Sequence, residues 1–71
     1  MQSCPIGELA LRIGVAVSEH DLTELKAALA ETYNQCDELG GEAAVKRAIA
    51  LMSARQKCWF DQAVVQIQQG V

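Results

Sequence analysis

The sequence predicts an all-α protein, built as an antiparallel helical hairpin (about 18–39 and 42–69) with a short N-terminal helical segment. Three observations support this fold class. Two long segments carry apolar residues in steps of three and four, which is the spacing of one helical face. A glycine pair, Gly40 and Gly41, separates these segments. The two apolar stripes also match each other when the chain is folded back at the glycines.

The first helix of the hairpin is predicted over residues 18–39. Ser18 is a candidate N-cap, and Asp21, three residues later, is placed like the acidic partner of a capping box. Gly40 follows the last apolar position, where a left-handed residue commonly ends a helix. The apolar stripe of this helix consists of Leu22, Leu25, Leu29, Tyr33, Cys36 and Leu39.

The second helix of the hairpin is predicted over residues 42–69. Glu42 places an acidic side chain at its N-terminus, and no Gly or Pro follows before Gly70. Folding the chain at the glycine pair sets Leu29 opposite Met52 and Leu22 opposite Trp59. The second helix then extends beyond the first, so its last apolar residues require another element to cover them.

The N-terminal segment, residues 6–17, is the candidate cover for that end of the hairpin. Its apolar residues Ile6, Leu9, Ile13 and Val17 fall on one helical face. Two glycines and several β-branched residues also leave a strand or an irregular arm open as alternatives near its end. The whole chain, 1–71, is expected to form a single small helical domain, because a chain of this length builds only one core.

Composition narrows the classes of function. The formal net charge is −3 and the six basic residues are scattered, which does not favour nucleic acid as a partner. No apolar run approaches the roughly 20 residues that span a bilayer, so membrane insertion is not expected. The first residues lack a signal-peptide pattern, which indicates a cytoplasmic location. Cys4, Cys36 and Cys58 show no metal or redox spacing, and reduced thiols are expected.

No residues of the sequence point to an enzyme, a cofactor site or a metal site. His20 is the only histidine, and it stands between Glu19 and Asp21. A catalytic His–acid pair needs a nucleophile nearby, and no motif supplies one. A metal would need three or four converging ligands. We therefore interpret His20 as a solvated residue in the first turn of a helix.

Residues 6–17 resemble the opening of the MerR-type helix-turn-helix. The letters IGELA, residues 6–10, are similar to the first helix of that family, and Gly14-Val15-Ala16-Val17 is similar to its turn. The resemblance implies DNA binding through the helix that follows the turn. That helix begins Ser18-Glu19-His20-Asp21-Leu22, whereas the family places Arg and Thr there. The basic wing is also absent, which leaves a degenerate helix-turn-helix regulator as an alternative reading.

The layout of residues 18–68 resembles the small E-type co-chaperones of type III secretion systems. Its most specific letters are LGGEAA and QAVVQI, residues 39–44 and 62–67. In that family the hairpin packs against a helical-repeat chaperone, and together they keep the needle subunit soluble in the bacterial cytoplasm. The resemblance therefore implies a helical protein partner and no catalytic role.

Taken together, these observations predict a small protein-interaction module that works by covering apolar surface, with a homodimeric helical-bundle adaptor as an alternative. Trp59 and Phe60 are the only Trp and Phe, and they are read either as core or as a binding hot spot. The predicted partner-binding residues lie on the last helix and on the N-terminal segment: Trp59, Phe60, Val64, Val65, Ile67, Ile6, Leu9 and Ile13.

Overall fold

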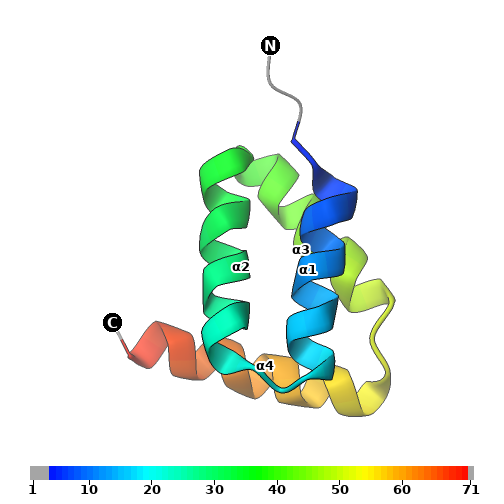
Figure 1. The fold of residues 1–71 in the computed structure, drawn as a ribbon, viewed down its shortest axis with the longest axis vertical. Coiled ribbons are helices and arrows are strands. Elements are labelled where there is room, and N and C mark those ends of the chain that lie inside the picture. Colours follow the sequence, from blue (N-terminus) through cyan, green and yellow to red (C-terminus); the bar gives the residue numbers. More distant parts are fainter. Residues whose placement is uncertain (1–3, 71) are drawn as a thin grey trace.

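A computed structural model describes residues 4–70 and shows four α-helices without a strand in that range. Figure 1 shows α1 and α2 side by side, α3 behind α1, and α4 running across one end of the pair. The all-α prediction is confirmed, and the helix packing is broadly consistent with the expected hairpin. The helix bounds are α1 Ile6–Ser18, α2 Leu22–Gln35, α3 Glu38–Ala50 and α4 Ala54–Gln69.

Helix α1 occupies the centre of the fold and packs mainly against α2 and α3. Its buried face includes Ile13, Ala16 and Val17, none of which is accessible to solvent. Half of the buried apolar residues of the described chain are alanines, contributed by all four helices. Small side chains let helix axes approach closely, because little volume separates the backbones. The N-terminal segment is thus a helix that forms the middle of the core, rather than a cover over one end.

The corner between α1 and α2 is fixed by backbone hydrogen bonds around His20. The amide of Asp21 donates to the carbonyl of Ala16, and the amide of His20 donates to Val17. This pair of bonds is a Schellman motif, in which the residue after the C-cap is left-handed. His20 adopts that conformation, with φ of 53°, although it is not glycine.

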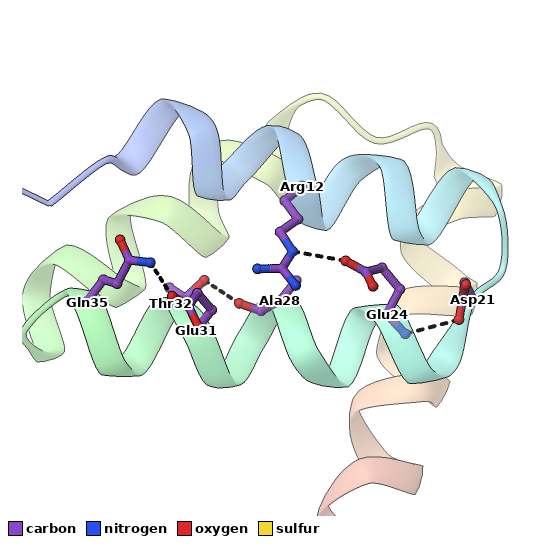
Figure 2. A network of polar contacts seen from close by, with 7 residues as sticks. All are labelled: Arg12, Asp21, Glu24, Ala28, Glu31, Thr32 and Gln35. Atoms are coloured by element: carbon purple, nitrogen blue, oxygen red, sulfur yellow. Dashed lines mark hydrogen bonds and ion pairs between the residues drawn. The ribbon is translucent and has the colours of Figure 1, made fainter.

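Asp21, rather than Ser18, is the N-cap of α2, because its side chain accepts a hydrogen bond from the amide of Glu24. Figure 2 shows this cap and the polar contacts along α2.

The guanidinium Nε of Arg12 donates to Glu24 at 2.9 Å and joins α1 to α2. The hydroxyl of Thr32, fully buried, donates to the carbonyl of Ala28 at 2.7 Å. Gln35 donates to Glu31 on the exposed side.

The corner between α2 and α3 lies at Cys36 and Asp37, which corrects the predicted turn at the glycine pair. Asp37 is the N-cap of α3, and its carboxylate accepts from the amide of Gly40 at 2.7 Å. The glycines therefore lie in the first turns of α3. They permit close approach: a Cβ on Gly40 would lie 3.1 Å from Cys4 Sγ, and one on Gly41 would lie 3.0 Å from the ring of Tyr33.

The predicted helix over 42–69 is in fact two helices, because the chain breaks between Ala50 and Ala54. Ser53 starts α4 with a capping box, in which its hydroxyl accepts from the amide of Gln56 and the Gln56 side chain accepts from the amide of Ser53. The amide group of Gln56 also donates to Ser18 Oγ at 3.1 Å, which links the start of α4 to the end of α1. The break removes the register that paired Leu22 with Trp59.

A disulfide between Cys4 and Cys36 joins the start of the described chain to the end of α2. The expectation of reduced thiols is wrong for this pair, and Cys58 is a free, exposed thiol. The disulfide belongs to a small apolar cluster that includes Ile6, Leu9 and Ala44. Residues 1–3, on which the absence of a signal-peptide pattern partly depends, lie outside the described residues.

Alanine substitution should have opposite effects on stability at Gly14 and at Gly40. Gly14 lies within α1 and has open space where a Cβ would stand, so Gly14→Ala should stabilise the fold by about 0.5–1 kcal/mol through helix propensity. Gly40→Ala would crowd Cys36 Cβ and Cys4 Sγ and should cost about 1–3 kcal/mol. Urea unfolding of both variants measures this difference, and a stabilising Gly40→Ala would contradict the close packing described here.

The disulfide predicts a redox-dependent stability. It closes a loop with a sequence separation of 32 residues, for which chain entropy suggests about 4 kcal/mol of stabilisation. Cys36→Ser should lower the free energy of unfolding by up to this amount, whereas Cys58→Ser should change it little. Urea unfolding with and without dithiothreitol provides the measurement. Equal stability of the wild type under both conditions would show that the disulfide does not constrain the chain.

Candidate protein-binding groove

An apolar groove of about 410 Å³ lies between α2, α3 and α4, and we refer to it as the α2–α4 groove. Its volume is within the range of about 300–1,000 Å³ that is typical of ligand pockets. The groove is open on one side, and most of its lining is apolar. The residues that line it are Lys26, Leu29, Ala30, Tyr33, Val45, Phe60, Val64, Ile67 and Gln68.

One wall of the groove is a face of α2 that the core leaves partly free. Leu25, Ala28 and Thr32 form the buried stripe of α2, while Leu29 and Tyr33 lie on the adjacent face. Leu29 is half-buried, and Tyr33 retains 57% of its accessible surface. Because the ring of Tyr33 lies over Gly41, the glycine fixes how closely this wall approaches α3.

The floor and the opposite wall come from α3 and α4. Phe60 is 5% exposed and belongs to the main core, so it anchors α4 below the groove. Val45 of α3 and Val64 and Ile67 of α4 are half-buried and pack against the same core. A half-buried aliphatic side chain gains further burial when a partner covers it, at about 25 cal/mol per Å² of apolar surface.

The polar groups at the groove are few. Lys26 is the only charged residue in the lining, and Gln68 supplies the only side-chain amide there. Within residues 4–70, ion pairs link Arg12 to Glu24 and Lys57 to Asp61, and Lys26 forms none. Its ammonium group is therefore available to an incoming acidic group.

The structure places the predicted partner-binding residues of α4 in three settings. Phe60, Val64 and Ile67 meet in the groove. Trp59 is half-buried and stacks against His20, with ring centroids 5.1 Å apart, so His20 contacts an aromatic ring rather than water alone. Val65 is 50% exposed and does not line the groove.

The predicted residues of the N-terminal segment do not reach the groove. Leu9 and Ile13 are buried, at 4% and 0% exposure, among the helices that α1 contacts. Ile6 is half-buried and packs in the cluster around the disulfide. Leu9 and Ile13 therefore hold α1 in the core, and Ile6 keeps part of its surface exposed beside the disulfide.

A second, smaller depression of about 220 Å³ lies between α1, the end of α3 and the start of α4. Leu11, Val15 and Leu51 at its edge are 67%, 48% and 79% exposed. Gly14, which forms part of its lining, has no neighbour where a Cβ would stand. This depression adds to the apolar surface that residues 4–70 leave uncovered.

The described residues show no grouping of three His, Cys, Asp or Glu side chains that could hold a metal ion. None of the four described helices combines the length and the apolar character that a membrane crossing requires. Every buried side-chain nitrogen or oxygen in residues 4–70 has a hydrogen-bond partner. Of the two depressions described above, the α2–α4 groove is the larger.

Sequence reasoning missed the contribution of α2 and α3 to the groove. Leu29 and Tyr33 were assigned to the hairpin core, and Lys26 and Val45 were not considered for binding. The spacing of Lys26, Leu29 and Tyr33 already places them on one helical face. Recognising it as a second face of α2 would have required knowing that Leu25, Ala28 and Thr32 form the buried one.

Comparison with protein-family models found no match, and searches among curated proteins and among solved structures returned no similar protein.

Phe60 and Val64 should differ sharply in their effect on stability. Phe60→Ala removes a buried aromatic ring from the core and should cost about 3–5 kcal/mol. Val64→Ala truncates a half-buried side chain at the groove and should cost about 1 kcal/mol or less. Urea unfolding followed by circular dichroism gives both values. Similar costs for the two variants would mean that Phe60 is not the anchor of α4.

Proposed function

We propose that this chain is a small protein-interaction module that binds a partner protein through the α2–α4 groove. The observation that carries the proposal is the groove itself, in which Phe60, Val64 and Ile67 of α4 meet Leu29 of α2. Binding would remove this apolar surface from water, and it would stabilise the folded chain because only the folded chain has the groove.

The co-chaperone layout suggests one form of this function, in which the partner is a helical chaperone or a secretion subunit. The Cys4–Cys36 disulfide bears on where such a module acts. Cytosolic glutathione keeps most thiols reduced, so the disulfide favours an oxidising compartment over the cytoplasm. A cytoplasmic co-chaperone would have to bind its partner with Cys4 and Cys36 as thiols, and Cys4→Ser tests whether binding survives in that state.

The function predicts that a charge in the groove abolishes partner binding. The bait protein is compared in three forms, wild type, Ile67→Glu and Val65→Glu, in pull-downs from the native host. Ile67 lines the groove, and Val65 lies on the same helix outside it. A partner should therefore be recovered with the wild type and Val65→Glu and lost with Ile67→Glu. Recovery with Ile67→Glu would refute the groove as the binding site.

Sedimentation velocity of the chain alone distinguishes a homodimer from a module that binds a different protein. A dimer of the wild type that becomes a monomer in Ile67→Glu, but not in Val65→Glu, would identify a second copy of the chain as the partner. Circular dichroism of each variant confirms that the helices remain folded, so that loss of binding is not loss of structure.

A further inference from the structure

We infer that the occupant of the α2–α4 groove is an amphipathic helix that carries acidic residues beside its apolar face. This inference rests on the proposed function and specifies the class of partner. It follows from the backbone chemistry of the walls, from the dimensions of the groove and from the charge at its edge.

The walls of the groove favour a helix over an extended peptide. Both walls are α-helices, Leu22–Gln35 and Ala54–Gln69, whose backbone groups pair within each helix. They offer no free strand edge, so an extended segment would bury amide and carbonyl groups without partners. A helix satisfies its own backbone and can present only side chains to the apolar lining.

The α2 wall of the groove corresponds to about two turns of helix. It runs from Lys26 to Tyr33, while α4 crosses the end of α2 and bounds the groove there (Figure 1). At about 1.5 Å per residue the α2 span is roughly 10 Å long. Such a length accepts apolar side chains at i, i+3 or i+4, and i+7 of a bound helix.

The positive charge of Lys26 favours acidic residues on the flanks of the bound helix. Lys26 is exposed, is the only charged lining residue, and forms no ion pair within residues 4–70. The chain as a whole carries −3, which repels an acidic partner at long range. This repulsion is screened beyond about 8 Å at physiological salt, so the local attraction to Lys26 decides the preference once the helix is in place.

The test uses two synthetic helical peptides of about 14 residues that share one leucine stripe at i, i+3, i+4 and i+7. One peptide carries Glu on both flanks of the stripe, and the other carries Lys at the same positions. Fluorescence anisotropy measures the binding of each peptide to the oxidised full chain. The Glu peptide should bind about 1.5- to fivefold more tightly, which is the range expected for exposed ion pairs.

Three variants test whether Lys26 and the groove cause the preference for the Glu peptide over the Lys peptide. Lys26→Glu should reverse it, whereas Lys46→Glu, an exposed lysine of α3 outside the lining, should leave it unchanged. Ile67→Glu should abolish binding of both peptides. Raising the salt to about 1 M should remove the preference but not the binding, because the screening length falls to about 3 Å.

The outcomes distinguish this inference from the function on which it rests. Equal binding of the two peptides, or an unchanged preference in Lys26→Glu, would overturn the acidic flank while the groove remains a protein-binding site. Saturable binding of dodecanoate with neither peptide bound would overturn the helix and indicate an acyl ligand. Peptide binding that Ile67→Glu leaves intact would overturn both the inference and the proposed function, because the groove would then not be the site.

Discussion

The close approach of α1 to α2 and α3 through alanine faces is the constraint on which the rest of this structure depends. Ala10 and Ala16 of α1, Ala28 of α2, and Ala44 and Ala48 of α3 are all buried. Alanine has high helix propensity and loses no side-chain entropy on burial, so it suits a chain of 71 residues. The cost is that each contact buries little apolar area. Caps and a disulfide must therefore define the corners.

The same constraint accounts for the groove. Ile13 and Leu25 fill the centre beside the alanines, and several other large side chains lie at the edge of the core. Phe60 still reaches the core from α4, but Val64, Ile67 and Leu29 are only half-buried around it. A fold that packs much of its centre with small residues thus leaves several aliphatic side chains where another molecule can cover them.

Helical periodicity predicted the fold class, but it did not place the corners. Gly40 follows an apolar stripe and reads as a helix end, whereas Asp37, three residues earlier, caps its amide and starts a helix there. The break before α4 was visible in the letters, because Ser53 and Gln56 have the spacing of a capping box.

The disulfide and the groove could not be predicted in the same way. Three cysteines allow three pairings, and the choice depends on how the helices pack. Predicting the groove requires the position of α2 relative to α4. The predicted hairpin, folded at the glycine pair, did not give that position because the chain breaks again before α4. Phe60, Val64 and Ile67 were nonetheless predicted to bind a partner, because the second predicted helix extends beyond the first and leaves them uncovered. The structure brings these three residues together.

The disulfide also divides the chain into two parts that differ in covalent constraint. The loop closed by Cys4 and Cys36 contains α1 and α2 entirely, while α3 and α4 form a linear tail. Opening that releases α4 from the ends of α1 and α2 leaves this loop intact. We therefore expect amide hydrogen exchange to be fastest in α4. The helix that supplies Phe60, Val64 and Ile67 to the groove is then also the one that can adjust to a partner without unfolding the rest.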